Sequence, residues 1–280
     1  MQRIIAGIPS YFGEGETRIR RFKAHQVQLE WIENQKIPTF IYAQDYTSKE
    51  YKKSPLITYK KFKEPDQWAV FKTMFLEHFY STDIEWALLM DNDAGLYDHH
   101  LGYNIFQHME NFPHLWKNVD MWYPLDPRKE PFNHLYNAHP EIYKNNLVLT
   151  FGSMTLKGTM IVLKNPKFSK KEPLFFPKEV KSSGDTDFLI RALMNEYRAY
   201  KNNSCILKEI VDSGKYSTIP WLADMKERAK LVAQDKIIFA QKYGIPYKER
   251  KNGGITFEAK KFYKKYVGKY PQTIAIPKEG

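Results

Sequence analysis

The chain has 280 residues, of which 42% are hydrophobic and 15% aromatic, enough for a substantial core, so intrinsic disorder of the whole chain is excluded. No apolar run reaches the roughly 20 residues that span a bilayer, and no secretory signal is recognisable, so we expect no membrane insertion. The single cysteine, Cys205, excludes an intrachain disulfide and a multi-cysteine metal site, and we expect a cytoplasmic protein.

The net charge of +11 is unevenly distributed along the chain. Residues 220–280 hold 14 Lys and Arg against 6 Asp and Glu, so most of the excess lies near the C-terminus. A basic segment beside a nearly balanced body suggests a surface for a polyanion. A solvated helix without a partner explains the same charge equally well, so charge alone leaves both interpretations open.

Strands and helices alternate in the first third of the chain. An apolar, β-branched run at Arg3–Ile8 predicts a strand, and the pattern at Thr17–Asn34 predicts a helix with Thr17 as its N-cap. The alternation continues with strands and one aromatic-rich helix: Thr39–Ala43, Leu56–Tyr59, the helix from Pro65, and Trp86–Met90. This order predicts an α/β fold with a mostly parallel central sheet flanked by helices.

The rest of the chain is less regular. Its expected helices and strands are Tyr103–Asn111, Asp120–Pro124, Leu147–Phe151, Thr159–Leu163, the helix Phe188–Tyr200, and the strand Cys205–Val211. A long helix at Ile219–Tyr243 and a Lys-rich, aromatic segment at Phe257–Tyr270 follow. We therefore expect an α/β domain over residues 1–218 and a basic helical C-terminal extension over residues 219–280.

Asp91-Asn92-Asp93 directly follows the buried strand Trp86–Met90. Ligands of parallel sheets gather at the carboxyl ends of the strands. Two carboxylates offer the oxygen ligands that Mg²⁺ or Mn²⁺ prefers, and such a metal binds a diphosphate. A turn that merely ends the strand is the commoner explanation of an isolated D-x-D, but this position after a buried strand favours a metal site.

Gly184-Asp185-Thr186-Asp187 opens the next predicted helix. The positive end of the helix stabilises carboxylates there, so simple helix capping explains the motif when it is taken alone. The functional alternative is that one of the two aspartates is a general base, which deprotonates a sugar hydroxyl within hydrogen-bond reach.

Together, the two acidic motifs and the N-terminal strand that ends in Pro9-Ser10 resemble the GT-A nucleotide-sugar glycosyltransferases, over about residues 1–215. The resemblance implies a Rossmann-like GT-A fold and a divalent metal, Mn²⁺ or Mg²⁺, held by Asp91 and Asp93 against the sugar diphosphate. It further implies that Asp185 is the base of an inverting transfer. Asp187 then contacts the acceptor or caps the helix.

The same resemblance implies a set of donor-binding residues: Ile8, Pro9, Ser10, Tyr11, Asp45 and Asn92, together with the two metal-binding aspartates. The family often adds a metal-binding histidine late in the chain. No histidine follows His139 here, and Asp212 is the expected substitute as a third metal ligand.

Within this family, the chain is most similar in size, motif order and basic tail to the bacteriophage glucosyl-DNA β-glucosyltransferases. That similarity implies UDP-glucose as the donor and glucosylated hydroxymethylcytosine in duplex DNA as the acceptor. Lys251, Lys260 and Lys264 are then the expected acceptor contacts, because lysines neutralise phosphates. The aromatic residues among them either stack on bases or pack onto the body.

Two other functions fit parts of the pattern. A GT-A enzyme acting on a polysaccharide or lipid-linked sugar is one, because a basic amphipathic tail also suits an anionic membrane. A non-catalytic nucleic-acid-binding protein, in which both acidic motifs only cap helices, is the other. A metal-dependent nuclease is less favoured, because no Lys or His lies beside the D-x-D in the sequence.

Overall fold

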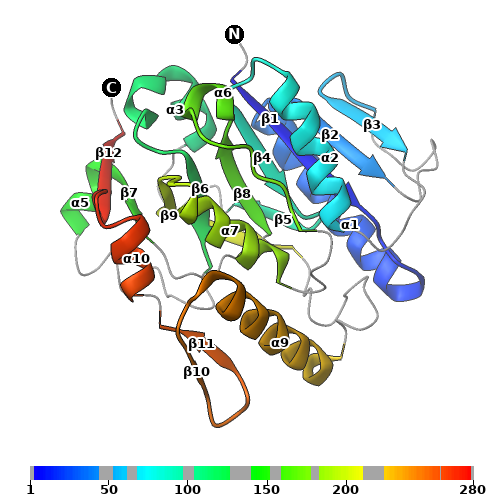
Figure 1. Ribbon diagram of the computed structural model, residues 1–280. Helices are drawn as coiled ribbons and strands as arrows, with labels where there is room; N and C mark the ends of the chain where they lie inside the picture. The colour runs from blue at the N-terminus through cyan, green and yellow to red at the C-terminus, as the bar shows by residue number, and fades with distance from the viewer. Residues whose placement is uncertain are drawn as a thin grey trace.

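The computed structural model describes residues 3–43, 53–61, 68–96, 104–126, 140–151, 159–177, 183–210, 224–258 and 260–278. These residues form a ten-stranded mixed sheet with helices on both faces and a separate two-stranded hairpin (Figure 1). No helix in these ranges is long and apolar enough to cross a membrane.

The strands of the sheet are β1 (Ile4–Ser10), β2 (Thr39–Ala43), β3 (Ile57–Lys61), β4 (Trp86–Met90), β5 (Ala94–Leu96), β6 (Met121–Leu125), β7 (Asn146–Thr150), β8 (Met160–Lys164), β9 (Ala199–Glu209) and β12 (Thr273–Pro277). The hairpin consists of β10 (Tyr247–Glu249) and β11 (Ile255–Phe257). The helices are α1 (Gly15–Asn34), α2 (Trp68–Ser81), α3 (Ile105–Asn111), the 3-10 helix η1 (Pro113–Trp116), α5 (Pro140–Asn145), α6 (Pro166–Ser169), α7 (Gly184–Met194), α9 (Met225–Tyr243) and α10 (Lys260–Tyr266).

The strand order is β12-β7-β9-β6-β8-β4-β1-β2-β3, with β5 paired to β9. Strands β1 to β4 run parallel to one another, β8 is antiparallel between β4 and β6, and β9 is parallel to β6. Most strands therefore share one direction, and the predicted α/β fold with a mostly parallel central sheet flanked by helices is confirmed. Because β1 and β4 are parallel neighbours, their carboxyl ends meet at one edge of the sheet.

The central strands are apolar on both faces because helices cover both. On β1, Ile4 belongs to the core cluster with α1, whereas Ile5 belongs to the cluster with α2. All five residues of β4 are buried, as is typical of a parallel strand covered on both sides. Gly7 lets α2 approach closely, because a Cβ atom there would lie 2.3 Å from the Phe75 ring.

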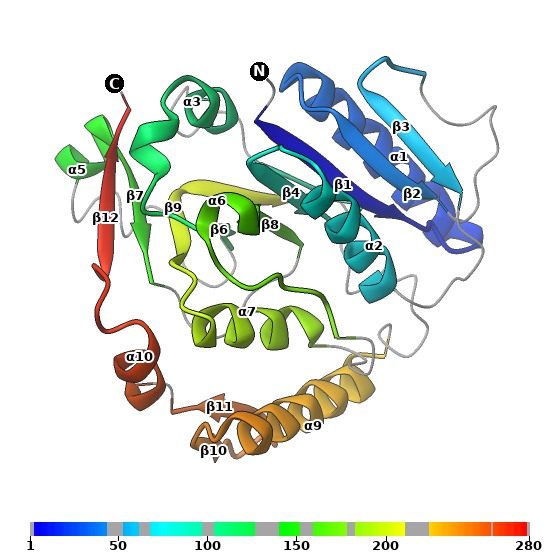
Figure 2. The same ribbon diagram turned by 45° about the horizontal axis from the view of Figure 1, so that its top comes forward.

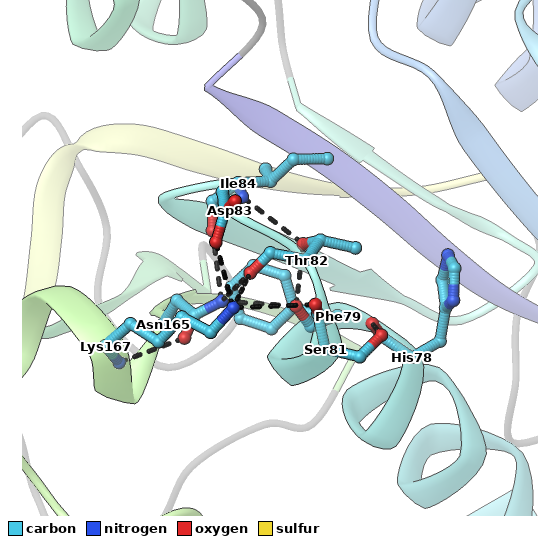
Figure 3. Close-up of polar contacts among 8 residues, drawn as sticks. All are labelled: His78, Phe79, Ser81, Thr82, Asp83, Ile84, Asn165 and Lys167. Carbon is cyan, nitrogen blue, oxygen red and sulfur yellow. Dashed lines mark hydrogen bonds and ion pairs between the residues drawn. The ribbon is translucent and has the colours of Figure 1, made fainter.

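Asn165 fixes the connection between α2 and β4 (Figure 3). Its side-chain Nδ2 donates to the carbonyl oxygens of Phe79 at 3.1 Å, Thr82 at 3.3 Å and Ile84 at 3.2 Å. The residue is fully buried, and these bonds satisfy its own amide hydrogens inside the protein. The amide thereby sets where the chain enters β4, the strand that carries the first acidic motif.

The predicted bounds of α7, α1 and β9 were wrong, and β9 begins at Ala199 and not at Cys205. Helix α7 spans Gly184–Met194 and not Phe188–Tyr200, so both acidic residues lie inside its first turn. Glu196, at a φ of 59°, ends this region, and Ala199 already pairs with Met121 in β9. Pairing with β6 thus overrides the helical pattern of this stretch. Helix α1 likewise begins at Gly15, with Glu14 rather than Thr17 at its N-cap.

The basic C-terminal segment is only partly helical. It contains α9, the hairpin, α10 and finally β12, which pairs antiparallel with β7 and so returns to the main sheet. Phe262 and Val267 are buried in the core cluster that includes α7, and Tyr263, Tyr266 and Tyr270 pack against it. Of the two predicted uses of these aromatic residues, the structure therefore shows packing onto the body.

Candidate functional site

The structure brings the first acidic motif and the end of β1 together. Asn92 Nδ2 donates to the Tyr11 carbonyl oxygen at 2.9 Å, which joins the loop after β4 to the loop after β1. Ser10 is fully buried at this edge, and its hydroxyl has no hydrogen-bond partner among the residues that the structure describes. Ile8 and Pro9 precede it on β1. Asp45 and Asp212 lie outside the described residues.

Arg21 on α1 holds the inner part of the motif. Its Nη1 atom donates to Asn92 Oδ1 at 2.9 Å and lies 3.4 Å from Asp93 Oδ2. Both charged side chains are nearly inaccessible, with 9% of Arg21 and 3% of Asp93 exposed. Asp93 therefore faces α1 inside the protein.

Lys72 on α2 holds the outer carboxylate. Its Nζ atom lies 2.8 Å from Asp91 Oδ1 and 5.4 Å from the centroid of the Phe176 ring. The Lys72 side chain is 2% exposed, whereas that of Asp91 is 40% exposed. Lys72 thus binds one carboxylate oxygen from the protein interior, and the rest of the Asp91 carboxylate is accessible at the edge of the sheet.

The backbone of the motif is fixed by a buried amide. Gln28 Nε2 donates to the carbonyl oxygens of Asp91 at 2.6 Å and Ala94 at 2.7 Å. Since this leaves Gln28 Oε1 as an acceptor, His25 Nδ1, 3.1 Å away, carries the proton and donates to it. His25 is fully buried, and burial lowers its pKa to about 4.

Acidification is therefore expected to destabilise the protein through His25. The unfolded chain takes up a proton near pH 6.5, whereas folded His25 resists protonation until about pH 4. Stability is then lost as the pH falls between these values, by at most about 3 kcal/mol. Urea unfolding across this range measures how steeply the free energy of unfolding depends on pH. The variant His25→Gln should show a weaker dependence. An equal dependence in both proteins would contradict this assignment.

The second acidic motif separates its two carboxylates by environment. Asp185 is half-buried, and its Oδ1 accepts from the Thr186 backbone N–H at 2.8 Å. Asp187 is fully buried, and its oxygens accept from the Tyr243 hydroxyl and from Arg191 Nε, each at 2.6 Å. Asp187 therefore ties α7 to α9 in these contacts, while Asp185 keeps access to solvent.

The two acidic motifs approach each other through aromatic packing. Lys72, which pairs with Asp91, also lies over the Phe176 ring. That ring stacks on Phe188 in α7, with ring centroids 4.4 Å apart. Thr73 Oγ1 accepts from the Phe176 N–H at 3.2 Å and so fixes this segment to α2. Figure 2 shows α2 and α7 on the same side of the sheet. Phe188, the residue after the second acidic motif, is thus linked through Phe176 and Lys72 to Asp91 at the carboxyl end of β4.

The predicted acceptor contacts lie elsewhere. Lys251 is exposed at the tip of the β10–β11 hairpin, Lys264 is exposed on α10, and Lys260 begins that helix. In the described parts of the chain, neither Lys251 nor Lys264 contacts Asp91 or Asp185. In the same parts, no group of three or more His, Cys, Asp or Glu side chains is arranged to hold a metal ion.

Sequence analysis missed the cations of this site. Arg21 and Lys72 interrupt the buried faces of two helices, and lysine and arginine are seldom buried unless they are paired. Lys72 follows Phe71 within the aromatic stripe of α2, so a charged residue on that face was the available signal. Its partner could not be read from the pattern.

No family model and no curated protein sequence matches this chain. Among solved structures, residues 1–349 of S. aureus TarS align with a TM-score of 0.49 and 12% identity over 86% of this chain and 72% of that one. The same fragment is also known in complex with UDP and with UDP-GlcNAc. A197 from STIV aligns with a TM-score of 0.40 and 14% identity, over 75% of this chain and 87% of its own. HddC from Yersinia pseudotuberculosis aligns with a TM-score of 0.43 and 9% identity, over 77% of this chain and 96% of its own.

Proposed function

We propose that this protein is a glycosyltransferase that uses a nucleoside-diphosphate sugar. The observation that carries the proposal is the accessible carboxylate of Asp91 at the carboxyl edge of β1 and β4, which is paired with the buried Lys72. A second accessible carboxylate, Asp185, opens the neighbouring helix α7. A diphosphate site next to a potential base is the minimum that sugar transfer requires.

The donor set at this edge suits a divalent cation in part. Mg²⁺ commonly uses one or two carboxylates and completes its shell with substrate phosphates and water. Asp91 fits that role, since its side chain is 40% exposed. Asp93 is paired with Arg21 inside the protein, so we assign it to fixing the loop. Asp212 stays a predicted third ligand. A bound Mn²⁺ or Mg²⁺ would neutralise charge on the departing diphosphate.

The chemistry we propose is a single in-line displacement with UDP-glucose as the donor. The acceptor hydroxyl oxygen attacks the anomeric carbon, the bond from that carbon to the diphosphate oxygen breaks, and Asp185 takes the hydroxyl proton. One displacement inverts the configuration and needs no covalent intermediate on the protein. We propose that the nucleoside binds beside the loop at Tyr11, which Asn92 joins to the first acidic motif.

For the acceptor we propose glucosylated hydroxymethylcytosine in duplex DNA. The basic C-terminal segment supports a polyanion, and the resemblance to the glucosyl-DNA β-glucosyltransferases suggests the modified base. The test incubates the full chain with labelled UDP-glucose, Mn²⁺ and either glucosylated or unmodified phage DNA, followed by nucleoside analysis. Label in a diglucosylated nucleoside from the glucosylated DNA is the expected result. Label in a polysaccharide or lipid-linked acceptor instead would overturn the DNA assignment. Good DNA binding without any thermal shift from UDP and Mn²⁺ would overturn the assignment as a glycosyltransferase.

A further inference from the structure

The β10–β11 hairpin is an exposed ribbon. Strand β10 is exposed at every position, and residues 250–253 at the turn are exposed as well. Its turn is closed by two backbone bonds, from the Arg250 N–H to the Gly254 oxygen and from the Gly253 N–H to the Arg250 oxygen, each at 2.8 Å. Gly253 has a φ of 76°, which favours glycine there. Figure 1 shows the ribbon at the periphery, on the far side of α9 from the main sheet.

The base of the ribbon is anchored on α9. Ile255 is buried, and its carbonyl oxygen accepts from Lys236 Nζ at 3.3 Å. The same ammonium lies 6.0 Å from the centroid of the Phe257 ring. The Glu258 N–H also donates to the Pro246 oxygen at 2.6 Å, which closes the open end. One end of the ribbon is thus fixed while the turn remains in solvent.

Helix α9 also connects the ribbon to the candidate base. Asp235, next to Lys236 in the sequence, accepts from the Ser183 N–H at 3.1 Å. Ser183 is the N-cap residue of α7, two positions before Asp185. One turn of α9 therefore holds both the first turn of α7 and the base of the ribbon.

The ribbon carries three cations against two carboxylates, Glu249 and Glu258, so its positive excess lies at the turn, with Arg250 and Lys251. Lys248 pairs with Glu258 at 2.5 Å, and Arg250 Nε donates to Thr256 Oγ1 on β11 at 2.6 Å. The Lys251 ammonium at the turn has no partner among the described residues. A guanidinium and an ammonium are thus presented together at the exposed end.

We propose that the β10–β11 hairpin inserts into the major groove of the duplex nucleic acid that carries the acceptor. The major groove, about 12 Å wide, admits a two-stranded ribbon. It is also the groove into which a substituent on C5 of a pyrimidine projects, as the thymine methyl does. A ribbon that shares its anchor, Asp235–Lys236 of α9, with the start of α7 then contacts the groove in which the acceptor sugar stands. This inference rests on the proposed function and names the element that binds its acceptor.

The test compares the double variant Arg250→Ala/Lys251→Ala with Lys23→Ala/Lys117→Ala, which removes the same charge from exposed positions elsewhere. Fluorescence anisotropy with a duplex of about 20 base pairs should show roughly tenfold weaker binding for the hairpin variant, and a log–log salt slope smaller by about 2. The control should bind like the wild type. Equal affinities for the two variants, or a loss confined to anionic vesicles, would overturn the proposal.

A second measurement locates the contact directly. The single cysteine is buried, and burial raises the pKa of the Cys205 thiol, so a cysteine introduced by Lys251→Cys can be labelled selectively. A photocrosslinker at position 251 should attach to duplex DNA, and one introduced by Lys23→Cys should not. Crosslinking at neither position would overturn the proposal. A missing thermal shift with UDP and Mn²⁺, with crosslinking at position 251 intact, would instead count against the donor site.

Discussion

Replacing Asp185 with asparagine is expected to lower the transfer rate by roughly 1,000-fold, because general-base catalysis contributes about 10² to 10⁴ in rate. Asparagine keeps the shape of the side chain and an oxygen that accepts from the Thr186 N–H at the start of α7. It does not take up a proton from the acceptor hydroxyl. UDP affinity, measured by calorimetry with Mn²⁺, should stay close to that of the wild type.

Asp187→Asn is the matched control, because it makes the same chemical change two residues further along α7. Asp187 is fully buried between Tyr243 and Arg191, so its loss should destabilise the contact between α7 and α9. The expected result is a lower melting temperature, with near-normal transfer by the protein that remains folded. Full transfer by Asp185→Asn would remove Asp185 as the base. A normal melting temperature for Asp187→Asn would contradict its structural role.

The position of the first acidic motif could be predicted from the sequence because the evidence is local. The run Trp86–Met90 is apolar throughout, and the alternation before it indicates parallel strands, so the following aspartates had to lie at the carboxyl edge. The orientation of the carboxylates could not be predicted. It depends on Arg21 and Lys72, which reach the motif from two different helices and are set by how those helices pack.

The C-terminal half shows the opposite balance between local and distant interactions. The stretch after Met194 has a helical pattern, yet Ala199 and Tyr200 are strand residues because β6 is available as a parallel partner. Thr273–Pro277 gives too short a signal to place in a sheet, and its pairing with β7 spans more than 120 residues. Local propensity carries little weight where such distant pairing competes.

Asp91→Asn is expected to destabilise the folded state more than Lys72→Met, by about 2 kcal/mol, although both break the same ion pair. Lys72 is 2% exposed, so Asp91→Asn removes the negative charge 2.8 Å from a buried ammonium. Asp91 is 40% exposed, so water can hydrate it when Lys72 is removed. Methionine also fills the space of the lysine stem beside Phe176. Urea unfolding of the two variants and of the double variant measures the difference and the coupling.

The same pair of variants separates stability from donor binding. Lys72→Met retains the accessible carboxylate, so it should keep a thermal shift with UDP and Mn²⁺, whereas Asp91→Asn should lose that shift while remaining folded. Because Asp91→Asn is also the less stable variant, calorimetry of UDP with Mn²⁺ on the folded protein must confirm that the lost shift is lost binding. Equal stability losses would show that another group compensates the Lys72 charge. An unchanged shift in Asp91→Asn would remove Asp91 from the diphosphate site and, with it, the observation on which the proposed function rests.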